Sequence, residues 1–132
     1  MPKTLLIIAA SLLIQSCNYK NDNEKTVSTD NRQPTGKCET LIGKKLPHGK
    51  VSQAITIPSG QYQAPDGKIY TLPAFCRVHG IAQPSNDSNI HFELWLPSEN
   101  WTGRYYQLGN GGFSGAIHYG PLAASLKQGN AV

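Results

Sequence analysis

The clearest hydrophobic pattern in the chain lies in residues 89–96, where apolar and polar side chains alternate. Such alternation predicts a strand with one face against a core. One face would carry Ile90, Phe92, Leu94 and Leu96, and the other His91, Glu93 and Trp95. Residues 97–103 predict a turn and residues 104–108 a second strand, so the two strands would form a β-hairpin with a long loop.

Shorter patterns before residue 89 predict further strands. Ile55 and Ile57 would lie on one face of a short strand. Residues 75–81 predict another strand, with Cys76 and Val78 facing inward. Turn-forming Pro, Gly, Ser, Asn and Asp residues separate these strands at 58–60, 65–68 and 84–88.

A single helix is predicted near the end of the sequence. Leu122 and Leu126 are four residues apart and would share one helical face, and Pro121 suits a first helical turn. Lys127 would lie in the last turn, with Gly129 just beyond it as the residue that ends the helix.

The order of these elements predicts an α/β fold. Several strands are followed by a glycine-rich loop, the helix, and the start of another strand at Ala131 and Val132. A strand–helix–strand unit usually belongs to a parallel sheet with a right-handed crossover, and such a sheet needs both faces covered. One helix cannot cover two faces. We therefore interpret residues 38–132 as the N-terminal segment of a longer α/β protein.

The first residues predict export. Residues 1–17 contain Lys3 and an apolar run at 5–14 that is too short to span a bilayer, which needs about 20 apolar residues. Residues 14–17 (Ile-Gln-Ser-Cys) resemble a bacterial lipobox, so Cys17 would be lipidated. An ordinary signal peptide with an incidental cysteine is the alternative. We expect a lipoprotein of the bacterial cell envelope, at the outer membrane or facing the periplasm, anchored to the membrane through Cys17. Residues 18–37 are too polar to fold and predict a flexible tether.

The charge and the cysteines bear on nucleic-acid binding, disulfide formation and zinc binding. The formal net charge is +4, but the basic residues are scattered and form no stripe between aromatic residues, so nucleic acid is not an expected partner. In an exported protein, the pair Cys38 and Cys76 predicts a disulfide, with two free buried thiols as the alternative. Their spacing and the lack of nearby histidines argue against zinc.

The glycine-rich loop at residues 109–115 (Gly-Asn-Gly-Gly-Phe-Ser-Gly) is the main candidate for chemistry. It departs from the Gly-x-Gly-x-x-Gly pattern of nucleotide-binding loops. It could be a plain turn. Its place between a predicted strand and a predicted helix suits an oxyanion-hole loop, with backbone N–H groups around Gly111 and Gly112 as donors.

Other residues are weaker candidates for a catalytic nucleophile or for metal ligands. Ser114 is a poor nucleophile candidate, because Ala116 stands where the Gly-x-Ser-x-Gly elbow needs glycine. None of the four histidines has metal-ligand spacing. His91 shares a strand face with Glu93 and would be solvated or paired across the sheet. No metal site is expected in this segment.

Two long runs in the sequence resemble the tannase and feruloyl esterase family. The first is residues 72–97, which include Leu-Pro-Ala-Phe-Cys-Arg-Val and Asn-Asp-Ser-Asn-Ile-His-Phe-Glu-Leu-Trp-Leu-Pro. The second is residues 101–115, Trp-Thr-Gly-Arg-Tyr-Tyr-Gln-Leu followed by the glycine-rich loop. The resemblance covers residues 38–132. It departs from the family pattern at Thr102, where asparagine is usual.

The resemblance implies a serine carboxylic-ester hydrolase with an α/β-hydrolase fold. The substrates would be small aromatic esters such as gallates or hydroxycinnamates, and Gly111 and Gly112 would contribute one oxyanion donor. It also implies that Cys38 pairs with Cys76, and that a structural calcium belongs to a lid domain. The family's nucleophile elbow, Asp and His lie beyond the position matching Val132. These 132 residues alone are therefore expected to be an inactive fragment.

A second hypothesis belongs to a different class of protein. The chain could be a small lipid-anchored, β-rich binding module for sugars or phenolics. Its aromatic residues Trp95, Trp101, Tyr105 and Tyr106 would then form the binding surface. The alternative for these four side chains is a place in the core or beneath a lid.

Overall fold

The computed structural model describes residues 36–132. The predicted signal segment, Cys17 and nearly all of the predicted tether lie outside the described residues. Among the residues that are described, the search for a helix long and apolar enough to span a bilayer finds none.

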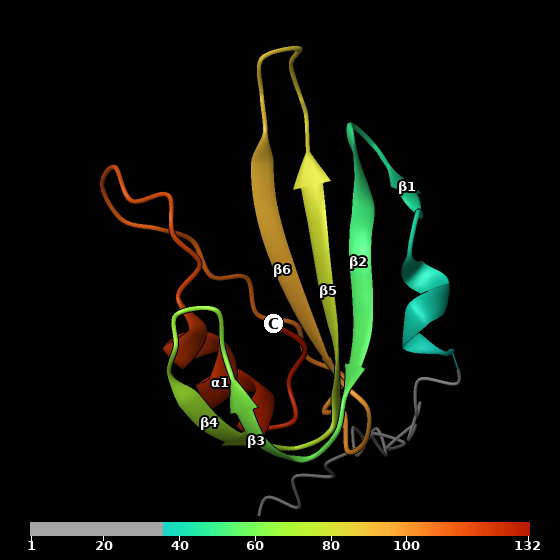
Figure 1. The fold of residues 1–132 in the computed structure, drawn as a ribbon, viewed down its shortest axis with the longest axis vertical. Coiled ribbons are helices and arrows are strands. Elements are labelled where there is room, and N and C mark those ends of the chain that lie inside the picture. The colour runs from blue at the N-terminus through green and yellow to red at the C-terminus, as the bar shows by residue number, and fades with distance from the viewer. Residues whose placement is uncertain (1–35) are drawn as a thin grey trace, which may run out of the picture.

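A four-stranded antiparallel sheet forms the centre of the fold, and a two-stranded hairpin and a helix lie against its lower half (Figure 1). The strand order in the sheet is β1-β2-β5-β6, and β3 pairs with β4 in the hairpin. The strands are β1 (Lys45–Leu46), β2 (Gly49–Ile57), β3 (Gly60–Gln63), β4 (Ile69–Leu72), β5 (Phe75–Ala82) and β6 (Ile90–Pro97). The helices are the 3-10 helix η1 (Cys38–Leu41) and α1 (Tyr119–Lys127).

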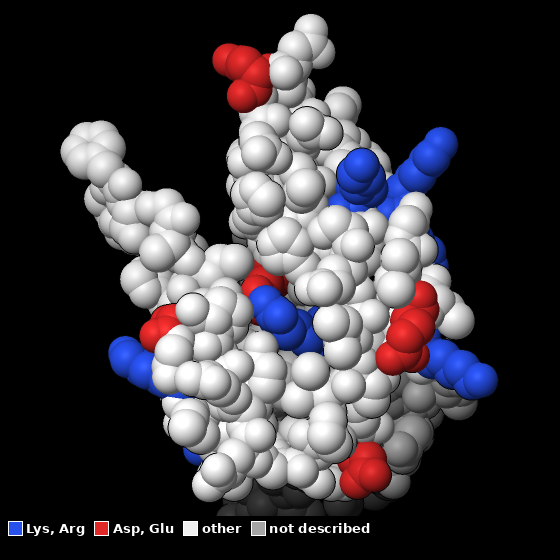
Figure 2. Space-filling model, in the orientation of Figure 1, with Lys and Arg blue, Asp and Glu red and all other residues white. Residues whose placement is uncertain are grey.

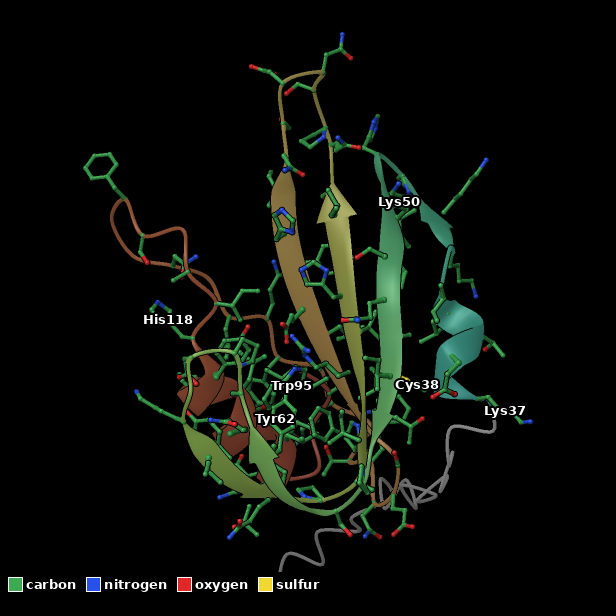
Figure 3. The ribbon with its side chains drawn as sticks, in the orientation of Figure 1. Lys37, Cys38, Lys50, Tyr62, Trp95 and His118 are labelled. Atoms are coloured by element: carbon green, nitrogen blue, oxygen red, sulfur yellow. A yellow bond between two sulfur atoms is a disulfide. The ribbon has the colours of Figure 1, made fainter. Side chains whose placement is uncertain are left out.

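Each face of the sheet has its own hydrophobic cluster. On one face, α1 and the β3–β4 hairpin pack against Phe75 and Trp95, both of which are fully buried. The Tyr62 ring meets the Trp95 ring edge-on, with 5.6 Å between ring centres (Figure 3). On the other face, η1 covers a smaller cluster around Ala54 and Val78. Each face of the sheet is therefore covered over part of its length within the described residues.

The structure confirms the predicted strand at β6, including the two faces of its alternation. The deepest burial on this strand is on the mixed face. Trp95, on the mixed face, is fully buried, whereas Ile90, on the aliphatic face, is 54% exposed. The prediction of β5 is also confirmed, with Cys76 and Val78 buried as expected. Phe75 is buried on the opposite face, because β5 is a central strand.

The predicted hairpin between residues 89–96 and 104–108 is wrong. The hairpin partner of β6 is β5, in a register that runs from Phe75↔Pro97 to Ala82↔Ile90. Residues 104–108 form no strand of their own. The loop at 97–103 carries them away from β6, and the last residues of the chain lie between the two segments.

Those last residues pair with both neighbours. Trp95 and Val132 exchange two backbone hydrogen bonds of 2.8 and 3.1 Å, which is an antiparallel pattern. On the other side, Ala131 forms a parallel bridge with Tyr105. The sheet is therefore mixed and the fold is of the α/β type. Parallel pairing across the helix is present at this one bridge, although neither segment forms a strand.

The helix ends as the sequence predicts. Gly129 has a φ of +77° and its N–H donates to the Leu126 carbonyl at 2.9 Å. The next N–H, that of Asn130, donates to the Ser125 carbonyl at 3.3 Å. This pair of bonds is a Schellman motif, which turns the chain back toward the sheet and delivers Ala131 and Val132 to their pairing positions.

At one glycine in the centre of the sheet, an aromatic ring from the neighbouring strand occupies the space where a side chain would lie. Gly80 on β5 lies opposite Phe92 on β6. A Cβ atom at Gly80 would fall within van der Waals overlap of the Phe92 ring, at 2.6 Å from Cε1 and 2.8 Å from Cε2. The Phe92 ring therefore fills the volume that a side chain at residue 80 would occupy.

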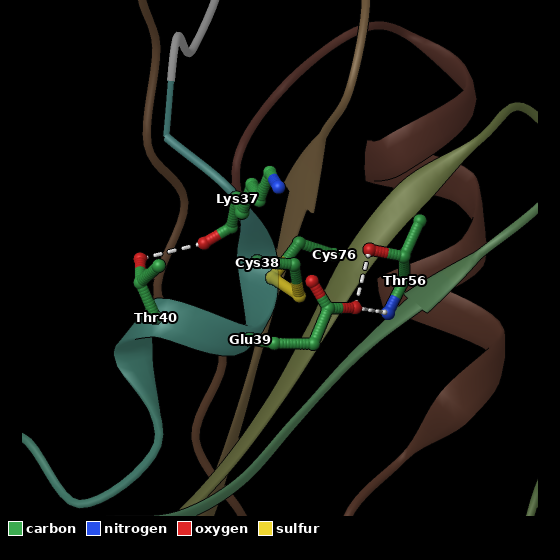
Figure 4. Close-up of a disulfide and its surroundings, with 6 residues drawn as sticks. All are labelled: Lys37, Cys38, Glu39, Thr40, Thr56 and Cys76. Atoms are coloured by element: carbon green, nitrogen blue, oxygen red, sulfur yellow. Dashed lines mark hydrogen bonds between the residues drawn. A yellow bond between two sulfur atoms is a disulfide. The ribbon is translucent and has the colours of Figure 1, made fainter.

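The predicted disulfide between Cys38 and Cys76 is present and ties η1 to β5 (Figure 4). The two Cα atoms are 5.5 Å apart, within the ordinary range for a disulfide. Beside it, a carboxylate oxygen of Glu39 accepts hydrogen bonds from the Thr56 N–H at 3.1 Å and the Thr56 hydroxyl at 2.8 Å. The disulfide and Glu39 together hold η1 against the sheet.

Replacing both Cys38 and Cys76 with alanine is expected to lower the free energy of unfolding by about 3–4 kcal/mol in the chain-entropy model. The disulfide closes a loop with a sequence separation of 38 residues, so its loss frees a long segment in the unfolded state. Urea denaturation with and without reductant measures the effect. Reductant should destabilise the wild-type protein and leave the double variant unchanged. Equal wild-type midpoints in both conditions would contradict the prediction.

Candidate active-site loop and the buried network beside it

The glycine-rich loop at residues 109–115 extends away from the sheet and the helix (Figure 1). It follows the segment that bridges to Ala131, and it precedes α1. The Ser114 N–H donates to the Gly111 carbonyl at 3.4 Å, which closes a tight turn, and Gly112 inside that turn has a φ of +60°. The loop is exposed throughout its length.

Packing within the described chain does not explain why the loop is so rich in glycine. A Cβ atom added at Gly109, Gly111, Gly112 or Gly115 would meet nothing within 4 Å. Only Gly112 has a backbone conformation that other residues rarely adopt. A plain turn therefore explains one glycine, and the others leave the backbone open to approach from outside.

An apolar groove of about 750 Å³ lies between the loop and the edge of β6. Its walls include Leu94, Trp101, Tyr106 and Leu108, and His118 lies near the start of α1 (Figure 3). Binding pockets for small molecules usually measure about 300–1,000 Å³ and are lined mainly by apolar side chains. The groove has the size and character of a small-molecule site.

Next to this groove, the carboxylate of Glu93 is buried and fully used as a hydrogen-bond acceptor. Its side chain is only 2% exposed. One oxygen accepts from Arg77 Nε at 3.0 Å and from Trp95 Nε1 at 2.9 Å. The other accepts from a second Arg77 nitrogen and from the Tyr119 hydroxyl at 3.1 Å. The network joins β5, β6 and the first residue of α1.

The network shifts the acid–base behaviour of its members. Burial raises the pKa of Glu93, but the hydrogen bonds from Arg77, Trp95 and Tyr119 outweigh it and hold that pKa below its usual value. Burial and the nearby Glu93 carboxylate raise the pKa of the Tyr119 hydroxyl to about 12. Glu93 is therefore a fixed anion and Tyr119 a fixed neutral donor at physiological pH.

The segment that contains this network and loop matches a known family model. Residues 76–132 match the model described as tannase and feruloyl esterase. Residues 76–132 belong to the tannase and feruloyl esterase family. The matched segment includes the loop, α1, β6 and nearly all of β5.

Several proteins that are similar to this chain are named as esterases. It is 43% identical over 95 residues to an uncharacterised esterase of Xanthomonas campestris, covering 71% of this chain and 16% of that protein. It is 34% identical over 127 residues to a protein of Aspergillus terreus named "probable feruloyl esterase B-1". That match covers 96% of this chain and 24% of that protein. A crystal structure of an esterase from Aspergillus oryzae matches with a TM-score of 0.60 and 32% identity, covering 71% of this chain and 21% of that one. The chain thus spans less than a quarter of each of these tannase-family or esterase relatives.

The structure places the predicted site residues in two separate parts of the fold. Gly111 and Gly112 lie in the exposed loop, whereas Cys38 and Cys76 hold η1 against the sheet. His91 does not pair with Glu93, because Arg77, Trp95 and Tyr119 occupy that carboxylate. The nearest partner of His91 is His79.

The predicted set of exposed aromatic residues is wrong for one member. Trp95 is fully buried in the core, so it cannot bind a ligand at the surface. Trp101, Tyr105 and Tyr106 are 40%, 59% and 46% exposed, and all three line the groove.

The sequence analysis missed the Glu93 network. Its signal was available in the alternation of residues 89–96, where a carboxylate and a tryptophan share the face that packs on the helix. A carboxylate on a strand face that packs against a core must be paired or hydrogen-bonded, because an unpaired buried charge is unfavourable. In the structure, the network fixes Tyr119, the first residue of α1, which lies four residues after the end of the loop at Gly115.

Charged side chains of both signs are dispersed over the face drawn in Figure 2.

Among residues 36–132, no group of three or more His, Cys, Asp or Glu side chains is placed so that it could hold a metal ion.

Proposed function

We propose that this chain contributes the oxyanion-hole loop of a serine carboxylic-ester hydrolase with the α/β-hydrolase fold. One observation carries the proposal. The loop at 109–115 follows the segment that runs parallel to Ala131, and the last residues lie between that segment and β6. In α/β-hydrolases, the loop between the third strand and the first helix supplies one oxyanion donor.

The chemistry assigned to the loop is stabilisation of a developing negative charge. Backbone N–H groups at Gly111 and Gly112 would donate to the oxyanion of a tetrahedral intermediate. A serine activated by histidine and oriented by aspartate would form the acyl-enzyme. We assign these three residues to a part of the protein outside these 132 residues, since Ala116 breaks the elbow pattern at Ser114. The 132 residues alone would then be inactive.

The proposed substrates are small esters of aromatic acids. Two observations support this class. The groove beside the loop is lined by Trp101, Tyr105 and Tyr106, which can stack on an aromatic acyl group. Relatives include proteins named as feruloyl esterases. For the whole protein, we also propose a structural calcium ion in a lid domain and a membrane anchor through a lipidated Cys17.

Hydrolysis of model esters tests this function. The protein produced from the whole gene should release ferulate from methyl ferulate or gallate from methyl gallate, and should act more slowly on an aliphatic ester of similar size. Absence of hydrolysis of all three esters would overturn the proposal. Faster hydrolysis of the aliphatic ester would overturn the aromatic preference alone.

The alternative of a binding module has less support. Burial of Trp95 removes one of its four proposed aromatic contacts. The groove that contains the remaining three also borders the glycine-rich loop, as expected for a catalytic pocket.

A further inference from the structure

Two histidines and a serine form a chain of contacts on the sheet face that also carries Glu93 and Trp95. His79 Nε2 lies 3.4 Å from His91 Nδ1, and their ring centres are 5.3 Å apart. His79 Nδ1 lies 2.9 Å from the Ser52 hydroxyl oxygen. His91 also lines the groove that the glycine-rich loop borders, and His79 lies opposite Glu93 in the sheet.

The sheet register explains why these side chains meet. In the β5–β6 ladder, His79 lies opposite Glu93 and His91 lies opposite Ile81. The two histidines are therefore diagonal neighbours on one face, within reach of long side chains. The β2–β5 register shifts between Val51 and Gln53, and this irregularity places Ser52 beside His79.

Hydrogen bonding from Ser52 determines which nitrogen of His79 carries a proton. The Ser52 hydroxyl donates to the His79 carbonyl at 3.0 Å, so its proton is already used. Toward His79 Nδ1 the hydroxyl can then only accept, and Nδ1 must be the protonated nitrogen of a neutral ring. In the metal-free protein, His79 Nε2 therefore accepts a hydrogen bond from the Nδ1–H of His91, and a metal ion bound by both nitrogens would replace that proton.

The separation of the two nitrogens fits two ligands of one metal ion. Two Zn–N bonds of about 2.0–2.1 Å at a tetrahedral angle place their nitrogens about 3.3 Å apart. The observed separation is 3.4 Å. A metal-binding histidine also commonly donates its other ring N–H to a neighbouring oxygen, as His79 does to Ser52.

We propose that His79 and His91 form a two-histidine site for a transition-metal ion such as Zn²⁺. Ser52 is a positioning residue that fixes the His79 tautomer. His91 is exposed and His79 is partly exposed, so the ion can reach both nitrogens from solvent. Two coordination positions of a tetrahedral ion stay open to water or to an external ligand. Imidazole nitrogens suit zinc, copper and nickel rather than calcium, so this site is distinct from a calcium site built of oxygen ligands.

Zinc titration of the full chain tests the proposal. The background is Cys17→Ser, because a free thiol also binds zinc. One Zn²⁺ should bind per chain, and His91→Gln should weaken the affinity by at least about tenfold. Ser52→Ala should also weaken zinc affinity, while the metal-free protein stays folded. The control is His48→Asn, at an exposed turn with a φ of +55° that asparagine tolerates.

Tautomer measurement provides a second, independent readout. Long-range ¹H–¹⁵N correlation spectra of the metal-free protein at neutral pH should show His79 protonated at Nδ1. Protonation of His79 at Nε2 would overturn the role of Ser52. Unchanged zinc affinity in His91→Gln, or an equal loss in His48→Asn, would overturn the metal site.

Discussion

Replacing Glu93 with alanine is expected to lower the free energy of unfolding by about 3–5 kcal/mol, the usual cost of breaking a buried ion pair. The substitution would leave the Arg77 guanidinium without its counter-ion and would also remove the acceptor used by Trp95 and Tyr119. Small domains are stable by only about 5–15 kcal/mol, so the variant would be close to unfolding.

Urea denaturation at neutral pH measures this effect. Glu99→Ala is the matched control, because Glu99 is an exposed glutamate just beyond β6 and should change stability by less than about 0.5 kcal/mol. Tyr119→Phe removes one hydrogen bond of the network and should destabilise by about 0.5–1.5 kcal/mol, well below the loss in Glu93→Ala. A Glu93→Ala loss no larger than that of Tyr119→Phe would contradict the role of the network.

The same network predicts an acid-dependent difference between wild type and Glu93→Gln. The folded-state pKa of Glu93 lies below its unfolded value, so its ionisation stabilises the fold above the unfolded pKa, which is about 4.3. That contribution is lost as the pH falls through the lowered folded-state pKa. The stability difference between wild type and Glu93→Gln should therefore shrink as the pH falls below about 4. A constant difference down to the lowest pH at which the protein folds would contradict the assignment.

Replacing Gly112 with valine is expected to lower kcat for ester hydrolysis by about 10²-fold or more, the usual loss when one oxyanion donor is removed. The φ of Gly112 is +60°, which a β-branched residue rarely adopts, so the loop backbone would change conformation. The N–H groups around residue 112 would then move from their positions. Because the donors act mainly in the transition state, KM should change less than kcat.

Steady-state kinetics of the whole-gene product with methyl ferulate check this expectation. Gly67→Val is the matched control, because Gly67 also has a positive φ, +82°, and open space where a Cβ would lie. Gly67 is in the turn between β3 and β4, so its replacement imposes similar backbone strain away from the loop. If Gly67→Val lowers kcat as much as Gly112→Val does, general strain explains the loss and the oxyanion assignment fails.

Local patterns predicted the local features of the fold. Alternation placed β5 and β6 and separated their faces, because side-chain direction in a strand depends only on position along it. Gly129 and Lys127 predicted the end of α1 for a similar reason, since a Schellman motif is made within a few residues. The disulfide was predictable from the number of cysteines and the expected export.

Pairing between distant residues was not predictable in the same way. Residues 104–108 have a strand-like composition, and nothing local shows that residues 130–132 would pair between them and β6. The burial of Trp95 also depends on α1, which packs on its face from more than twenty residues away. For the candidate site, the sequence located the loop, whereas the Glu93 network and the His79–His91 contact depend on the register of the sheet.

The contact between Gly80 and Phe92 has an evolutionary consequence. Any side chain at residue 80 would collide with the Phe92 ring, and loss of that ring would leave a void over Gly80. Single substitutions at either position are therefore unfavourable, while a larger residue at 80 combined with a smaller one at 92 restores the packed volume. Among related sequences, these two positions should consequently vary together, as a pair of compensating changes.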